Sequence, residues 1–204
     1  MKRTKVLLTL ACAVLLVAAS VMGTLAYLTS NDSVTNTFTV GNVKITLDET
    51  DVDNSTPNAD RDKANSYKLL PGHEYAKDPI VHVDATSEDC YLFVKVTNEI
   101  AAIEDTANTV AFQMAAKGWK AVDGQNGLYV YVGTAAGAAA PLAVSASANI
   151  TVFEKIKVAG TVDNTTLAGY ANKNITVTAY AVQKDGFESK GAAEIWTATF
   201  GATN

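Results

Sequence analysis

The chain has 204 residues, with 16 basic and 21 acidic side chains, two cysteines and two histidines. Without a leader ending at Ala26, the remaining 178 residues carry 13 basic and 21 acidic side chains, a net charge of −8. That length fits one domain with a substantial core. An acidic surface without a Lys/Arg cluster argues against nucleic-acid binding.

The first 26 residues have the pattern of an export signal. Basic residues at positions 2, 3 and 5 precede an uncharged apolar run over 6–21. The small residues that follow place a signal-peptidase site between Ala26 and Tyr27. We therefore expect residues 1–26 to be a signal peptide and the mature protein, 27–204, to be secreted.

Two alternatives remain open for this segment. The apolar run could serve as an uncleaved anchor, although it is shorter than the ~20 residues of a membrane span. Cys12 suggests a lipidation site, but few apolar residues precede it. After cleavage Cys90 is the single cysteine, so we expect a buried apolar thiol, with an intermolecular disulfide as the alternative.

Strand patterns recur through the rest of the chain. The first is within 36–47, where apolar residues at 43, 45 and 47 alternate with polar ones. Further runs rich in β-branched and aromatic residues lie at 80–83, 91–97, 128–132, 150–158 and 175–182.

Other segments differ from this pattern. The region 98–119 predicts one or two short helices ending at Gly118, and 191–196 predicts a short helical turn. The acidic segment 48–68 reads as a loop, and 135–148 as a loop or weak strand. The expected fold is all-β: a single antiparallel, jelly-roll-like β-sandwich over 27–204, with a helical insertion at 98–119.

The two histidines allow a weak metal-site hypothesis. The run HEYAK, from His73 to Lys77, begins like the zinc-peptidase motif HExxH but has lysine at the second ligand position. His73, His82 and Asp84 would form a three-ligand site only if a hairpin brought them together. We favour two ordinary histidines in a turn and a strand.

The acidic loop offers a second ion hypothesis. Its carboxylates lack the glycine and the final glutamate of an EF-hand loop, so a solvated loop is favoured and structural calcium is the alternative. They are Asp48, Glu49, Asp51, Asp53, Asp60 and Asp62. No nucleophile has an obvious base and no phosphate-binding glycine loop is present, so we expect no enzyme and no cofactor.

The run GTLAYLTSNDSVTNTFTVGNVKITLDE, residues 23–49, closely resembles the amino-terminal signature of the TasA/camelysin family of Gram-positive secreted proteins. Three later runs look like its core segments: LLPGHEYAKDPIVHV at 69–83, VFEKIKV at 152–158 and ITVTAYAVQKDGF at 175–187. The resemblance implies a jelly-roll sandwich, processing by a SipW-type signal peptidase, and subunits of biofilm-matrix fibres at the cell surface.

The same resemblance implies assembly by donor-strand exchange. The donor would lie in 27–40, with Val34, Phe38 and Val40 filling a neighbour's groove. The alternative is that this segment forms the first strand of its own subunit. A metallopeptidase activity described for camelysin-like members has no matching HExxH here.

Three functions remain in order of preference. The first is a self-associating fibre subunit, with a co-secreted matrix or anchor protein as a further partner. The second is a monomeric or wall-associated surface binding module, and the third is a cell-surface metallopeptidase.

Overall fold

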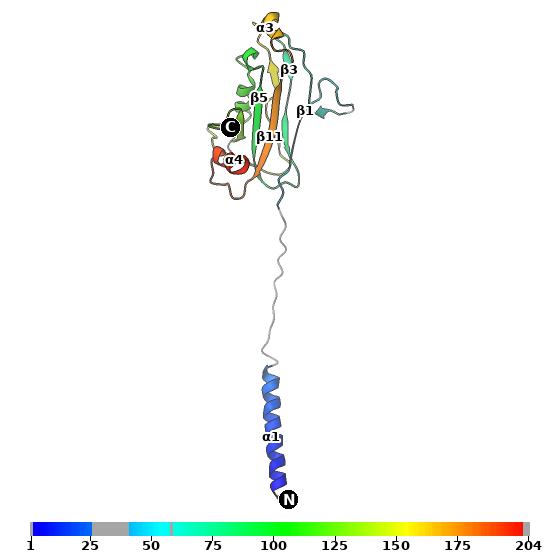
Figure 1. Cartoon of the computed structure of the whole chain (residues 1–204), viewed down its shortest axis with the longest axis vertical. Coiled ribbons are helices and arrows are strands. Elements are labelled where there is room, and N and C mark those ends of the chain that lie inside the picture. The colour runs from blue at the N-terminus through cyan, green and yellow to red at the C-terminus, as the bar shows by residue number, and fades with distance from the viewer. Residues whose placement is uncertain (1, 26–40, 58, 202–204) are drawn as a thin grey trace. The chain divides into compact units, whose positions relative to one another are not determined.

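The computed structural model describes residues 2–25, 41–57 and 59–201, and the chain divides into the units Met1–Val40 and Gly41–Asn204 (Figure 1). In the first unit, α1 (Lys2–Leu25) takes in nearly all of the expected leader. Its leucines and alanines favour a helix. Within the described residues, no helix has the length and apolar character that crossing a membrane requires.

The second unit is built mainly from antiparallel sheets. One sheet has the strand order β2-β1-β4-β9, another β11-β5-β7-β6 with β8 also on β5, and β10 pairs with β3. The strands are β1 (Ile45–Thr50), β2 (Arg61–Asp62), β3 (Glu74–Ala76), β4 (Ile80–Val83), β5 (Cys90–Asn98), β6 (Trp119–Ala121), β7 (Leu128–Tyr131), β8 (Ala143–Val144), β9 (Asn149–Thr151), β10 (Lys155–Lys157) and β11 (Ile175–Gln183). The short helices are η1 (Ala101–Ile103), α2 (Val110–Ala116), α3 (Asn164–Ala168) and α4 (Ala192–Phe200). The expected β-rich, antiparallel class is confirmed.

The central element is β5, which pairs with β11 along its whole length, from Cys90 opposite Gln183 to Asn98 opposite Ile175. Successive side chains of a strand point to opposite faces. Here both faces are covered, so β5 is almost continuously buried and separates two hydrophobic cores.

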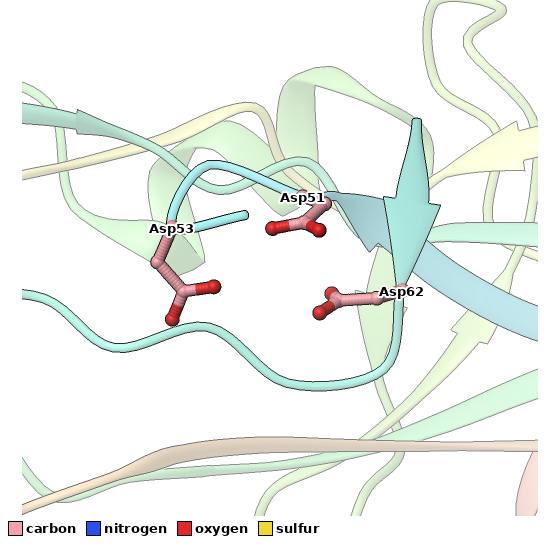
Figure 2. Close-up of side chains that lie close together, drawn as sticks. All are labelled: Asp51, Asp53 and Asp62. Carbon is pink, nitrogen blue, oxygen red and sulfur yellow. The ribbon is translucent and has the colours of Figure 1, made fainter. Parts of the chain in front are cut away.

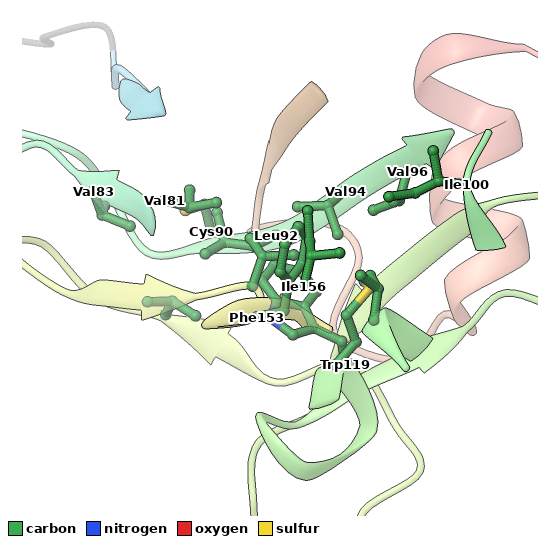
Figure 3. Packing of buried hydrophobic residues seen from close by; sticks show 14 of the residues in the cluster. Val81, Val83, Cys90, Leu92, Val94, Val96, Ile100, Trp119, Phe153 and Ile156 are labelled. Atoms are coloured by element: carbon green, nitrogen blue, oxygen red, sulfur yellow. The ribbon is translucent and has the colours of Figure 1, made fainter. Parts of the chain in front are cut away.

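The larger core lies on the face of β5 that carries Leu92 and Val94 (Figure 3). Val81 from β4 and Phe153 from the β9–β10 connection are fully buried in it. Burying one such side chain stabilises the fold by roughly 1.5–3 kcal/mol relative to exposure. Cys90 is also fully buried here, as expected from the sequence.

The smaller core lies on the opposite face, where α4 covers the sheet. Trp196 packs 5.6 Å from Phe93 and edge-on to Tyr180 at 5.0 Å, measured between ring centroids. The amino end of α4 is capped because the Glu194 carboxylate accepts a hydrogen bond from the Gly191 N–H at 2.8 Å. The carboxyl-terminal helix is therefore part of the folded unit.

The expected strand over 150–158 is wrong in one respect: it is two strands, β9 and β10. Val152 and Phe153 are consecutive and both pack into the larger core, whereas successive side chains of a strand point to opposite faces. The backbone N–H groups of Glu154 and Lys155 donate instead to Oε1 of Gln113, at 3.1 and 3.2 Å. The side chain of an α2 residue thus takes the place of a strand partner.

The region expected to be a helical insertion contains η1 and α2, and its last residue, Trp119, begins β6. Thr109 caps α2 by accepting a hydrogen bond from the Phe112 N–H at 3.1 Å. Gly118 follows α2 with φ +87°, and a Cβ there would lie 2.6 Å from the carbonyl carbon of Gly133. Only glycine fits this close backbone approach.

Strands also form in the segment expected to be a loop, 48–68, and in the segment expected to be a loop or a weak strand, 135–148. The polar segment 48–68 includes the end of β1 and the two-residue β2, and 135–148 includes β8. Both strands pair over only two residues. Neither lies in a run with the continuous apolar alternation that predicts a strand from sequence.

Candidate functional site

Two unpaired sheet edges face each other in the second unit. Across 45–48, β1 pairs with β4 on one side, and its other neighbour β2 begins only at Glu49. Among the described strands, β11 pairs only with β5. Cα atoms of β1 and β11 come within 8 Å, yet no ladder pairing joins the two strands in the described structure.

A groove of about 590 Å³ lies between these edges. Its apolar lining comes from alternate residues of the two strands, which are partly buried against the larger core: Ile45, Leu47, Ile175, Val177 and Ala179. Because the alternation places apolar side chains on one face, the groove combines an apolar floor with unsatisfied backbone edges.

The two edges run in opposite directions. Asn174 and Ile175, at the start of β11, line both this groove and a neighbouring cavity, as do Asn65 and Lys77. The Lys77 ammonium contacts Glu49 near the end of β1. The start of β11 therefore lies beside the end of β1.

The end of the groove marked by Lys77 is polar and largely buried. The side chains of Lys77 and Glu49 are 11% and 7% exposed, and Nζ lies 2.6 Å from Oε2. Nδ2 of Asn65 donates to the other oxygen, Oε1, at 3.0 Å. The Tyr67 ring centroid lies 5.8 Å from Nζ; burial first, and then the charge of Glu49, raise the pKa of the Tyr67 hydroxyl.

An arginine holds the next carboxylates in place. Arg61 bonds the Asp48 carboxylate through Nε and Oδ2 of Asp78 through Nη1, the latter at 3.1 Å. Asp78 also accepts from the Thr50 N–H at 2.7 Å. Burial raises the pKa of both carboxyls. The hydrogen bonds and the Arg61 charge outweigh burial, so the pKa of each carboxyl lies below its ordinary value. The network fixes β2 against the end of β1.

The structure does not assemble the hypothetical histidine site. His82 contacts Asp48 through Nε2 at 3.0 Å and Asn149 through Nδ1. Asp84 pairs with Lys44 at 2.9 Å, and the His73 ring packs edge-on against Tyr75. HEYAK consists of β3 and the residue on each side of it, and it is not a helix, because Pro71-Gly72 and Asp78-Pro79 bound it. No metal-binding group found among the described residues contains these three side chains.

Three carboxylates of the acidic loop do come together: Asp51, Asp53 and Asp62 each place an oxygen within 4.8 Å of the others (Figure 2). Their oxygens also accept backbone hydrogen bonds. Asp53 accepts from the N–H groups of Ser55 and Ser66, at 3.0 and 2.6 Å. Asp48 and Glu49 belong to the networks described above. This cluster is therefore the remaining candidate for calcium in the loop, and calcium binding stays a prediction.

The neighbouring cavity measures about 500 Å³. Tyr67, Tyr75 and Tyr170 line it together with Asn65 and Lys77. The Tyr75 hydroxyl accepts from the Leu70 N–H at 2.7 Å and donates to the Lys68 carbonyl, so the backbone of 68–70 holds this ring in place.

Comparisons with known proteins give no relative: no family model, curated protein or solved structure matches this chain. The expected cleavage site at Ala26 and Tyr27 lies outside the described residues, as do the expected donor residues Val34, Phe38 and Val40.

Sequence reasoning identified the alternation within 36–47, of which 45–47 belong to β1, and the strand at 175–182, but not the groove between them. Alternation predicts which face of a strand is apolar. It does not predict which edge lacks a partner, since that depends on contacts between distant segments. The groove lining was visible in sequence only as two ordinary amphipathic strands.

Proposed function

We propose that this protein is a secreted structural subunit that self-assembles into extracellular fibres by strand addition. The observation that carries the proposal is the groove between β1 and β11, where two unpaired edges flank an apolar floor. An extended segment in such a groove satisfies open N–H and C=O groups and buries alternate side chains. In this proposal the two main sheets form a jelly-roll sandwich that the added strand completes.

The amino-terminal segment 27–40 supplies a fitting occupant. Val34, Phe38 and Val40 are spaced by even numbers, so in an extended strand they lie on one face. That face would meet Leu47 and Val177 on the groove floor. The resemblance of residues 23–49 to the TasA/camelysin signature supports the same role, with secretion by a Gram-positive cell after SipW-type processing.

The start of the described unit favours donation to a neighbour over insertion into the same subunit. The Asn42 carbonyl accepts from the Glu88 N–H, and the Lys44 carbonyl from the Asp84 N–H, both at 2.9 Å. Gly41 does not have a positive φ. Residues 42–44 are thus held against the turn before β5, and a return into the subunit's own groove would need a reversal before Gly41. A head-to-tail donation does not close on itself and propagates a filament.

The test compares the processed protein with a chain starting at Gly41, using negative-stain electron microscopy and sedimentation. We expect filaments from the first and monomers from the second. Phe38→Asp in the donor and Val177→Asp in the groove should each abolish filaments. Phe112→Asp is the matched control, because Phe112 is 62% exposed and lies on α2, away from the groove lining.

Peptide binding by the two variants tests the donor segment and the groove separately. A Phe38→Asp subunit keeps its groove and should bind a synthetic 27–40 peptide, whereas Val177→Asp should not bind it. The proposal is wrong if the processed protein and the chain starting at Gly41 both stay monomeric over the concentration range tested. A processed monomer that binds no peptide would favour the surface binding module.

A further inference from the structure

We propose that Lys77 and Asn65 form an intramolecular isopeptide bond, promoted by Glu49. The inference rests on three side chains at the polar end of the groove and does not depend on fibre formation. One buried carboxylate is shared by an amine and a carboxamide: Lys77 Nζ lies 2.6 Å from Oε2 of Glu49, and Asn65 Nδ2 lies 3.0 Å from Oε1. The nucleophile (the Lys77 amine) and the electrophile (the Asn65 carboxamide) are therefore both held by the proton carrier, Glu49.

The Lys77 amine and the Glu49 carboxylate are both largely buried. Glu49 is 5% exposed as a residue, and the Lys77 side chain is 11% exposed, so water stabilises their charged forms poorly. Proton transfer along the 2.6 Å hydrogen bond converts the pair to a neutral amine and a carboxylic acid. The Tyr67 ring lies over Nζ on the side of the adjoining cavity.

The carboxamide is oriented by its own hydrogen bonds. Its Oδ1 accepts from the Val52 N–H at 2.7 Å, which polarises the carbonyl and would stabilise an oxyanion there. Its Nδ2 also donates to the Thr50 carbonyl at 2.8 Å, so the group that must leave points at acceptors. Fixed geometry of this kind replaces a bimolecular encounter by an intramolecular one.

The proposed step balances without an oxidant or a cofactor. The neutral Lys77 amine attacks Cγ of Asn65, and a C–N bond forms. Glu49 relays one proton from the attacking nitrogen to Nδ2, the Cγ–Nδ2 bond breaks, and ammonia leaves. The proton first taken from the Lys77 ammonium returns to solvent, so Glu49 ends as a carboxylate. The product is one amide bond between the segment after β2 and the segment before β4.

The primary test is the intact mass of the full-length chain, measured under denaturing conditions. We expect a mass lower than the sequence mass by one ammonia molecule, and tandem mass spectrometry should find the peptides containing residues 65 and 77 joined. Lys77→Arg and Glu49→Gln should each restore the full mass. Lys68→Arg, a nearby exposed lysine, is the matched control and should keep the loss.

A succinimide at Asn65-Ser66 would also lose ammonia, and Lys77→Arg separates the two products because a succinimide needs no lysine. An unchanged mass in the wild-type chain overturns the proposal. Ammonia loss that persists in Lys77→Arg, or a loss without joined peptides, overturns it equally.

Discussion

Replacing Gln113 by alanine should destabilise the β unit strongly, although the residue does not line the groove. Gln113 is 9% exposed, and its side-chain amide makes four hydrogen bonds to backbone groups. Nε2 donates to the carbonyls of Asn108 and Lys155, and Oε1 accepts from the N–H groups of Glu154 and Lys155. This one side chain joins α2 to the break between β9 and β10.

The magnitude follows from these bonds. A typical hydrogen bond contributes about 0.5–1.5 kcal/mol net, and a buried donor left unpaired costs about 1–3 kcal/mol. Water can reach some of the freed groups, so we expect a loss of about 2–4 kcal/mol in the free energy of unfolding. With a urea m-value of about 1–3 kcal/mol/M, the midpoint should fall by about 1–2 M.

Urea unfolding followed by tryptophan fluorescence measures this, since Trp119 and Trp196 are both about 2% exposed. Gln183→Ala is the matched control: it is the same substitution at an exposed residue, whose side-chain amide donates a hydrogen bond to the Asp185 carbonyl. The control should change stability by less than about 0.5 kcal/mol. If the two variants shift the midpoint equally, Gln113 does not hold the strand break in place.

Two further predictions concern titratable groups. Burial, aided by Asp89, raises the pKa of the Cys90 thiol to about 11, so a thiol reagent at neutral pH should label Cys90 only at the rate at which the protein opens. Labelling as fast as in urea would contradict this. The pKa values of Asp48 and Asp78 lie below 3.8 when folded. Their stabilisation is thus present above that value and is lost as pH falls through the folded pKa. Arg61→Gln should flatten the acid limb of the pH–stability curve below pH 4, and an unchanged limb would refute the assignment.

Much of the fold was visible in the sequence where apolar residues alternate over several positions. The long strand β5 covers the predicted 91–97 and is one residue longer at each end. The strand β11 covers the predicted 175–182 and is one residue longer at its carboxyl end. The short strand β2 was not predicted, and the segment containing β8 was predicted only as a loop or a weak strand. Each of these strands has two residues and depends on a partner supplied by another segment. The division of 150–158 depends on Gln113, a polar residue that no pattern links to that strand.

The candidate site was predictable only in part for the same reason. The sequence drew attention to His73, His82 and Asp84 as residue types that bind metal, but the fold gives each a different partner. Asp48–Asp62 was recognised as acidic, whereas the roles of Glu49 and Lys77 depend on two segments that meet only in three dimensions. Residue type suggests a chemistry, and tertiary contacts decide whether it is assembled.

The opposite directions of β1 and β11 restrict any strand that enters between them. Such a strand must run parallel to one neighbour and antiparallel to the other, so its two hydrogen-bond ladders differ in spacing and slant. Because Cα atoms of β1 and β11 come within 8 Å, the two strands must also separate to about 9.5 Å, two strand spacings, to admit it. Reversing the strand exchanges the two ladders and shifts its apolar side chains relative to the polar end at Lys77. The groove therefore distinguishes the two orientations of an incoming strand, and isotope-edited infrared spectra of a bound peptide would report which one it accepts.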